Sequence, residues 1–515
     1  MKSLPIRILF VAVALLLASS MSIRDNKAFE LVNIEGGAIR GTNNSKGDVH
    51  IFKGIPFAAP PVGNLRWKAP APVEPWKGVK QCVAFGPSPM QGKPTPFMVY
   101  TPEFLIPEEP ISEDCLHLNV WTAAKTPLEK RPVLVWIYGG GFSSGGSACA
   151  IYDGEELAKK GVVFVSLNYR VGVMGFFAHP ELSKENPNNA SGNYGLLDQI
   201  AALKWVQKNI SAFGGDPANV TIAGQSAGSM SVNCLVASPL AKGLFTKAIA
   251  ESGSNMVSKG LIRTTDLRVS ETTGKELADK AGFSSLEELR KMSAAEIQEK
   301  IKGRFGPVID GYVLPEPIPQ IFAKNQQNKV TLLTGWNQDE RFGQTTSMAE
   351  FRKQVTAKYS SEAEKIFKFY PANNEDQSAE SQKALGRDET FGISNYAWAK
   401  IQSKQKSKAY LYNFLRKPPA EGDYVQYGAF HTAEVPYAFN TLRYFNRPLQ
   451  PADYALADLM SSYWTNFAKT GNPNGKNLPE WPAFDDDRAM VMMFDAESQA
   501  KPFPRKEAMD TLFEL

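Results

Sequence analysis

The segment Gly224-Gln225-Ser226-Ala227-Gly228 places one serine between two glycines, directly after the β-branched run Val220-Thr221-Ile222. The β-branched run predicts a short buried strand, and the small residues that follow Ser226 predict the start of a helix. A serine in a sharp turn between strand and helix is raised out of the backbone, where its hydroxyl can attack a substrate. The helix N-terminus would offer unpaired N–H groups to an anion that forms at Ser226.

A second stretch, Gly141-Phe142-Ser143-Ser144-Gly145, has the same spacing. It follows a strand pattern, but it continues into a polar glycine loop with no immediate helix. Ser226 has both the strand before it and the helix after it, so we predict Ser226 as the nucleophile, in preference to Ser143 or to a purely structural helix cap.

A serine hydroxyl needs a base within hydrogen-bond reach, and the base needs an orienting carboxylate. The chain has four histidines. His50 and His117 lie inside strand patterns, and His179 precedes the serine. Hydrolases built on this turn carry their partners in the order Ser, acid, His. Only His431 follows Ser226, so we predict His431 as the base.

Two neighbouring carboxylates, Asp339 and Glu340, follow the predicted strand Val330 to Leu333. The acid should come just after a late strand of the sheet, and spacing alone does not choose between these two residues. One of them is expected to orient His431, and the other to be a solvated turn residue.

The anion of an acyl-transfer intermediate needs N–H donors. One donor should be the N–H of Ala227. Others should come from Tyr138-Gly139-Gly140-Gly141-Phe142, because adjacent glycines after a strand let backbone N–H groups face a ligand without obstruction. The chain has no GxxxxGK[ST], HExxH or CxxC pattern, so we expect no metal and no cofactor.

Alternating strand and helix patterns predict an α/β fold with a mostly parallel central sheet and helices on both faces. Residues 31–53 predict a small N-terminal antiparallel sheet.

The formal charge of +4 falls to +2 without Lys2 and Arg7, so nothing points to nucleic acid. Met1 to Ser20 predicts a secretory signal, and therefore a secreted or periplasmic protein with one catalytic domain over 21–515 and no further membrane span.

Several longer motifs resemble the type-B carboxylesterase family of the α/β-hydrolase fold, and most closely its bacterial para-nitrobenzyl-type esterases. Besides the turn at Ser226 and the glycine run, they are Phe52 to Ala58, Ser112-Glu113-Asp114-Cys115-Leu116, Gly192 to Gln199, Asn209 to Pro217 and Trp464 to Pro473.

The resemblance implies the functional roles of several residues. It implies a triad of Ser226, Glu340 and His431, which selects Glu340 over Asp339, and oxyanion N–H groups from Gly140, Gly141 and Ala227. It also implies supporting roles for Ser229, Ser254 and Glu434, and a disulfide between Cys82 and Cys115. The chain departs from the family pattern at Arg341, where a glycine is usual, and at Gln225, where cholinesterases carry Glu.

The sequence therefore predicts a carboxylic ester hydrolase that takes small-molecule esters. We expect neutral esters, because no tryptophan lies between Cys82 and Cys115 to face a cationic alcohol. Two alternatives remain: a catalytically silent adhesion protein on this fold, and an amide or thioester hydrolase with the same site. The sequence does not indicate an oligomeric state.

Overall fold

The computed structural model describes residues 29–257, 264–283, 285–340 and 344–515. The predicted signal segment, Met1 to Ser20, and Arg341 lie outside the described residues.

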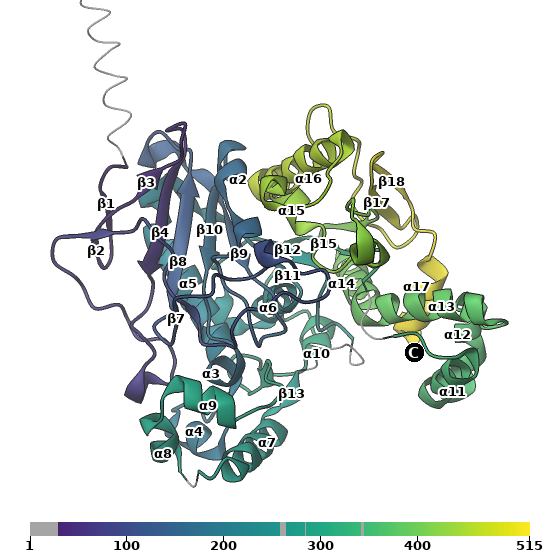
Figure 1. Ribbon diagram of the computed structural model, residues 1–515. Coiled ribbons are helices and arrows are strands. Elements are labelled where there is room, and N and C mark those ends of the chain that lie inside the picture. The colour runs from purple at the N-terminus through teal and green to yellow at the C-terminus, as the bar shows by residue number, and fades with distance from the viewer. Residues whose placement is uncertain (1–28, 258–263, 284, 341–343) are drawn as a thin grey trace, which may run out of the picture.

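The described chain is built around one sheet of eleven strands (Figure 1). Their order across the sheet is β18-β17-β16-β15-β12-β11-β9-β10-β8-β4-β3. Every neighbouring pair from β17 to β10 is parallel, and the strands at the two edges are antiparallel. The strands are β3 (Thr42–Asn43), β4 (His50–Pro56), β8 (His117–Thr122), β9 (Arg131–Ile137), β10 (Val163–Leu167), β11 (Gly215–Gln225), β12 (Lys247–Glu251), β15 (Thr331–Asn337), β16 (Ala409–Phe414), β17 (Met490–Phe494) and β18 (Gln499–Pro502). This confirms the predicted mostly parallel sheet.

The N-terminal strands divide between two sheets. β1 (Val32–Ile34) and β2 (Gly37–Arg40) form an antiparallel pair, and β2 pairs in parallel with β5 (Val79–Gln81). β3 and β4 instead extend the central sheet beyond β8, so only part of the segment 31–53 forms the expected small sheet. Local alternation predicted the strands but not this division, because the apolar side chains of β4 find their partners on β8, which lies far along the chain.

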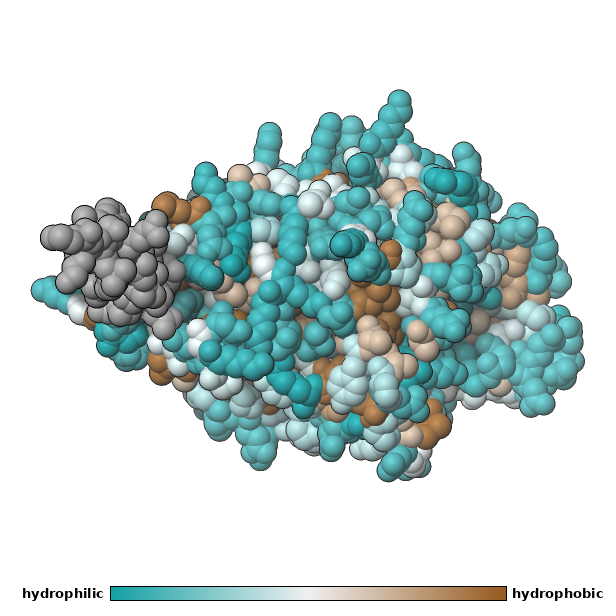
Figure 2. Space-filling model, turned by 90° about the horizontal axis from the view of Figure 1, so that it is seen from above, coloured by the Kyte–Doolittle hydropathy of each residue, from teal (hydrophilic) through white to brown (hydrophobic). Residues whose placement is uncertain are grey.

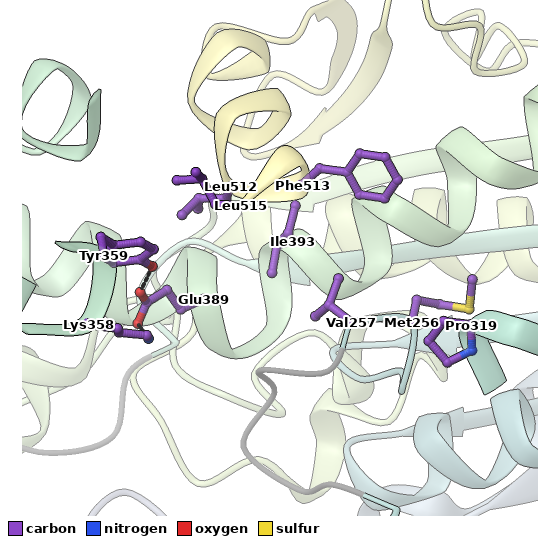
Figure 3. A pocket seen from close by; sticks show the side chains of 10 residues that line it. All are labelled: Met256, Val257, Pro319, Lys358, Tyr359, Glu389, Ile393, Leu512, Phe513 and Leu515. Atoms are coloured by element: carbon purple, nitrogen blue, oxygen red, sulfur yellow. Dashed lines mark hydrogen bonds and ion pairs between the residues drawn. The ribbon is translucent and has the colours of Figure 1, made fainter. Parts of the chain in front are cut away.

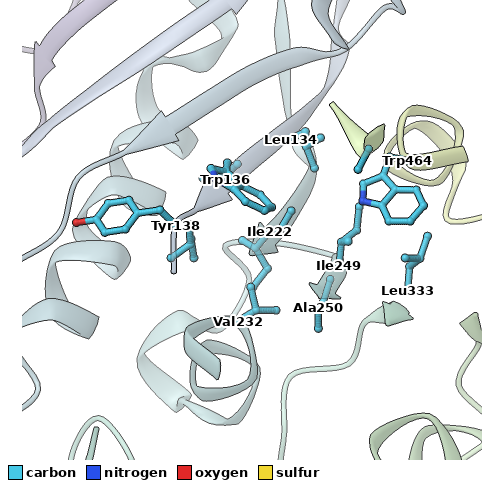
Figure 4. Packing of buried hydrophobic residues seen from close by; sticks show 14 of the residues in the cluster. Leu134, Trp136, Tyr138, Ile222, Val232, Ile249, Ala250, Leu333 and Trp464 are labelled. Atoms are coloured by element: carbon cyan, nitrogen blue, oxygen red, sulfur yellow. The ribbon is translucent and has the colours of Figure 1, made fainter. Parts of the chain in front are cut away.

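Helices cover both faces of the central sheet. α5 (Tyr194–Asn209) and α6 (Ala227–Ala237) pack on one face, and α2 (Glu155–Lys159) and α16 (Pro451–Thr470) on the other (Figure 1). In Figure 4, Trp464 of α16 and Val232 of α6 lie on opposite sides of the strands that carry Ile222 and Ile249. Burial of these large apolar side chains from both sides holds the central strands rigidly, so their carboxyl ends can support a site.

Seven of the other helices form two smaller groups, each with its own apolar cluster. The first group comprises α7 (Leu267–Lys280), α8 (Leu286–Lys291) and α9 (Ala294–Lys300). The second comprises α11 (Met348–Tyr359), α12 (Ala363–Phe369), α13 (Glu375–Arg387) and α17 (Lys506–Glu514). Between this second group and the sheet, α14 (Ile393–Lys404) packs on β15 and β16. Its Asn395 donates hydrogen bonds to the carbonyls of Ala250 and Gly335 at 3.1 Å, so the helix is tied to two central strands.

The predicted disulfide is absent, because Cys82 and Cys115 are both free, buried thiols. Cys82 follows β5, where its backbone N–H bonds to the carbonyl of Arg40. Cys115 lines a small cavity whose sulfur-containing neighbours are Met90 and Met174. The pairing that the family resemblance implied is therefore wrong, although the resemblance itself holds elsewhere. The side chain that the preceding segment places near Cys115 belongs to Met90 and not to Cys82.

The surface in Figure 2 is mostly hydrophilic, with apolar residues in small patches. In the part of the chain that the structure describes, no helix is both long enough and apolar enough to cross a bilayer.

Candidate active site

Ser226 lies in the predicted turn between strand and helix, where β11 ends at Gln225 and α6 begins at Ala227. Its backbone has φ 57° and ψ −123°, a conformation that costs free energy for a residue with a side chain. A Cβ on Gly228 would lie 2.0 Å from the carbonyl oxygen of Ile137, so only glycine fits there. Ser226 is partly exposed while its neighbours in the turn are buried, so its hydroxyl is presented to solvent.

Ser143, the alternative serine, lies in a different setting. Residues 141–143 form a turn, and the Ser143 hydroxyl donates a hydrogen bond to the carbonyl of Gly141 at 3.3 Å. The turn does not lead into a helix, so Ser143 lacks the N–H groups that α6 supplies beside Ser226.

His431 and Glu340 are brought together from segments 91 residues apart. The Nδ1 atom of His431 lies 2.8 Å from Oε1 of Glu340. The Glu340 side chain has no exposed surface, whereas 10% of the His431 side chain is accessible. A buried carboxylate on Nδ1 fixes the ring orientation and leaves Nε2 as the nitrogen that can accept a proton.

Asp339, the neighbouring carboxylate, binds the backbone of the histidine loop instead. Its Oδ2 accepts a hydrogen bond from the N–H of Ala429 at 2.8 Å, and its own N–H donates to the carbonyl of Ala429 at 3.0 Å. The two acids therefore have separate positions: Glu340 contacts the imidazole, and Asp339 holds the segment that carries it.

Three further side chains hold His431, and sequence reasoning did not assign them this role. The ring of Phe391 stacks on the imidazole, with centroids 4.5 Å apart and planes 13° apart. The Tyr100 hydroxyl donates to the His431 carbonyl at 2.9 Å. The Gln225 amide nitrogen lies 3.3 Å from Nε2. Phe391 and Tyr100 come from distant segments without a motif, whereas the position of Gln225 next to Ser226 was a usable signal.

The glycine run lies directly against the serine turn. A Cβ on Gly139 would lie 2.7 Å from the Gln225 carbonyl oxygen and 3.0 Å from Cβ of Ser226. Gly140 and Gly141 have φ values of +113° and +62°, which glycine adopts without strain. The predicted donors thus lie on the two segments that flank Ser226: the glycine run after β9, and the start of α6 at Ala227.

The residues predicted to support the site each bind a nearby segment. The Ser229 hydroxyl donates to the carbonyl of Gly253. The Ser254 hydroxyl lies 2.9 Å from both the carbonyl and the hydroxyl of Ser394 on α14. Glu434 accepts a hydrogen bond from the Asn337 side-chain amide. Together these contacts fix the loops after β12 and β15 around the site.

A pocket of about 260 Å³ lies nearby, between α17 and the loop after β12 (Figure 3). Its apolar lining includes Met256, Ile393 and Phe513, and an ion pair of 2.6 Å between Lys358 and Glu389 closes one side. None of Ser226, Glu340 and His431 lines this pocket, so it is separate from the reactive groups. Within the described ranges, no group of three or more His, Cys, Asp or Glu side chains is arranged to hold a metal ion.

Comparison with known proteins identifies the family of this chain. Residues 28–512 match the sequence profile of the Carboxylesterase family. The chain is 37% identical to the para-nitrobenzyl esterase of Bacillus subtilis (strain 168) over 506 residues, which cover 94% of this chain and 98% of that protein. It is 36% identical to the fumonisin B1 esterase of Sphingopyxis macrogoltabida over 498 residues, 90% of this chain and 86% of that protein.

A solved structure of a PNB esterase has a TM-score of 0.81 at 34% identity, and the match covers 94% of this chain and 99% of that one. The sequence profile, the named relatives and this structure confirm the resemblance and the α/β-hydrolase fold. The chain therefore belongs to the carboxylesterase family, and its named relatives are esterases.

Proposed function

We propose that Ser226, His431 and Glu340 form the catalytic triad of this esterase and that hydrolysis passes through an acyl-enzyme. The observation that carries the proposal is the 2.8 Å contact between His431 Nδ1 and the fully buried Glu340. A carboxylate on Nδ1 leaves Nε2 unprotonated, and the partly exposed ring can then take a proton from a serine hydroxyl.

In the first half of the reaction, Ser226 Oγ attacks the ester carbonyl carbon while its proton passes to Nε2 of His431. The tetrahedral oxyanion is stabilised by the N–H groups of Gly140, Gly141 and Ala227. When the intermediate collapses, the bond to the alcohol oxygen breaks and His431 returns its proton to the leaving alcohol. In the second half, His431 takes a proton from water while the water oxygen attacks the acyl carbon. When this second intermediate collapses, the bond to Ser226 Oγ breaks, His431 returns its proton to Oγ, and the acid is released.

The site favours neutral esters. Gln225 places an uncharged amide beside the imidazole, where a carboxylate would attract a cationic alcohol. The loop that carries Tyr100 is held by Arg447, which donates to the Val99 carbonyl at 2.8 Å. Arg447 therefore places a positive charge beside the loop that carries Tyr100, and this charge would repel a cationic alcohol.

The test is a series of p-nitrophenyl esters of increasing acyl length, assayed with wild type, Ser226→Ala and Ser143→Ala. Ser226→Ala is expected to lower kcat by about 10⁴–10⁶-fold for every ester. Ser143→Ala is the matched control, because it removes the serine of the second GxSxG pattern, and it is expected to stay within about tenfold of wild type. Full activity of purified, folded Ser226→Ala would refute the proposal.

A further inference from the structure

Four residues lie in one row across the carboxyl end of the central sheet. Gln225, Glu251, Gly335 and Tyr412 are register partners on β11, β12, β15 and β16. Partners in a parallel sheet project from the same face. Gly335 has no side chain, and the Tyr412 ring fills its place, because a Cβ there would lie 2.4 Å from that ring. Glu251 and Tyr412 therefore face one buried space on the side where Gln225 reaches His431.

Trp464 of α16 covers this space and donates its indole N–H to Oε1 of Glu251 at 2.8 Å. The backbone carbonyl of Glu251 also accepts the N–H of Ser226 at 2.9 Å. The backbone of Glu251 is therefore hydrogen-bonded to the proposed nucleophile, and its side chain lies in the buried space behind His431.

Three carboxyl groups meet here without exposed surface: Glu251, Glu340 and Glu434. Each has one oxygen that finds no hydrogen-bond partner among the described residues, and the same is true of the Tyr412 hydroxyl. In the described ranges, no lysine or arginine forms an ion pair with any of the three, and the one basic group in contact is His431, on Glu340. One cationic partner cannot balance three buried negative charges.

The pKa values agree with this geometry. Burial raises the pKa of Glu251 to about 8, although the Trp464 hydrogen bond opposes the shift. Burial also raises the pKa of Glu434 well above its ordinary value, and the charges of Glu251 and Glu340 raise it further. Burial raises the pKa of Tyr412, and the charges of the same carboxylates raise it further, so this phenol stays protonated.

We propose that Glu251 and Glu434 form an uncharged carboxyl pair behind the triad, so that Glu340 is the only negative charge that acts on His431. The inference rests on the proposed triad and extends it. Glu251 and Glu434 are positioning residues, since neither contacts the reacting atoms: Glu251 acts through the Ser226 backbone, and Glu434 through the loop that Asn337 anchors.

Ionisation of the Glu251–Glu434 carboxyl pair should lower the rate of the reaction at alkaline pH. When Glu251 loses its proton near pH 8, a negative charge appears in the buried space that Glu434 and Tyr412 also face, and the Trp464 indole N–H is hydrogen-bonded to it. That charge lies on the residue whose carbonyl binds the Ser226 N–H, and it opposes the negative charge that develops on the tetrahedral intermediate. We therefore expect kcat/KM of wild type to fall by about fivefold or more between pH 7.5 and 9.5.

Glu251→Gln tests this expectation, because glutamine keeps the shape of the neutral acid and cannot ionise. The variant is expected to lose the alkaline fall and to retain the rise at lower pH, while Glu251→Ala, which leaves a cavity, is expected to be at least tenfold slower than Glu251→Gln at pH 7. An alkaline fall of the same size in Glu251→Gln, or no fall in wild type, would overturn the proposal.

A second measurement does not depend on catalysis. The folded protein keeps the Glu251 proton up to about pH 8, whereas the unfolded chain loses it near the ordinary value of 4.5. Wild type therefore loses this stabilising contribution as pH rises from 4.5 to 8, and Glu251→Gln does not. We expect the difference in urea midpoint, Glu251→Gln minus wild type, to increase steadily from pH 4.5 to pH 8.

Asp453→Asn is the matched control, because Asp453 is equally buried but contacts Arg416 at 2.7 Å. Burial raises the pKa of Asp453, but the hydrogen bonds from Arg416, Gln450 and Tyr437 and the charge of Arg416 together outweigh it and lower the pKa, so the Asp453 charge is already present at pH 5. Asp453→Asn should be destabilised by a constant amount between pH 5 and 8. A pH-independent midpoint difference for Glu251→Gln would overturn the proposal. If the triad is wrong, Ser226→Ala retains activity, and the midpoint series still decides whether Glu251 holds a proton.

Discussion

The adjacent acids Asp339 and Glu340 have different chemical environments. Glu340 has no exposed side-chain surface and faces the imidazole, whereas Asp339 is partly exposed and binds backbone. Only the acid in contact with Nδ1 can stabilise the imidazolium that forms when the serine proton is transferred. The two residues therefore offer a paired test in which the same chemical change is made one position apart.

Glu340→Gln is expected to lower kcat/KM by about 10³–10⁴-fold, because the neutral amide cannot balance the developing charge on His431. Asp339→Asn is expected to lower kcat/KM by less than about tenfold and to reduce the free energy of unfolding by about 1–2 kcal/mol, through its weakened bond to Ala429. Steady-state kinetics and urea unfolding of both variants provide the check. The opposite order of kcat/KM losses would assign the catalytic acid to Asp339.

The turn around Ser226 depends on close contact between backbone segments. Gly224 and Gly228 face each other across the turn, and a Cβ on Gly224 would lie 2.5 Å from backbone atoms of Gly228. The strained Ser226 conformation is maintained because the close packing of β9, β11 and α6 leaves no space for another backbone conformation.

Gly228→Ala is expected to lower the free energy of unfolding by more than about 3 kcal/mol, because its Cβ would overlap the Ile137 carbonyl. Gly386→Ala is the matched control: Gly386 lies in α13 with no atom within 4 Å of an added Cβ. In that helix alanine should increase stability by about 0.5–1 kcal/mol. Urea denaturation of both variants tests the difference, and equal changes would show that the turn tolerates a Cβ.

Local patterns predicted the elements around the site but not the contacts between them. The β-branched run and the small residues around Ser226 predicted β11 and α6, because strand and helix periodicity is a local signal. The order of elements along the chain selected His431. Phe391, Tyr100 and Glu251 could not be assigned in this way, since each acquires its role only when distant segments pack together. The Cys82–Cys115 pairing came from the family resemblance and is not formed, because a resemblance in sequence does not reveal which side chain packs against Cys115.

The preference for neutral esters that we propose depends on parts of the chain that are far apart in sequence. The loop that holds Tyr100 and the turn that holds Gln225 place uncharged side chains against His431, and Arg447 places a positive charge beside the Tyr100 loop. None of them supplies a negative charge or an unoccupied tryptophan face for a quaternary ammonium group.

We therefore expect butyrylcholine and its uncharged isostere 3,3-dimethylbutyl butyrate to be hydrolysed with similar kcat/KM, or the neutral ester to be preferred. Competition between the two esters in one reaction, followed by product analysis, gives the ratio directly. A tenfold preference for the choline ester, about 1.4 kcal/mol of transition-state stabilisation, would show that a cation site exists.

The central claim is that Ser226 carries the acyl group during turnover. Its most direct test is rapid acid quenching of the enzyme during hydrolysis of p-nitrophenyl butyrate, followed by peptide mass spectrometry. The proposed mechanism predicts one butyryl group on the peptide that contains Ser226, at Ser226 itself, with none on Ser143 and none in Ser226→Ala. A butyryl group on another residue, or turnover with no acylated peptide under conditions that trap the intermediate, would contradict it.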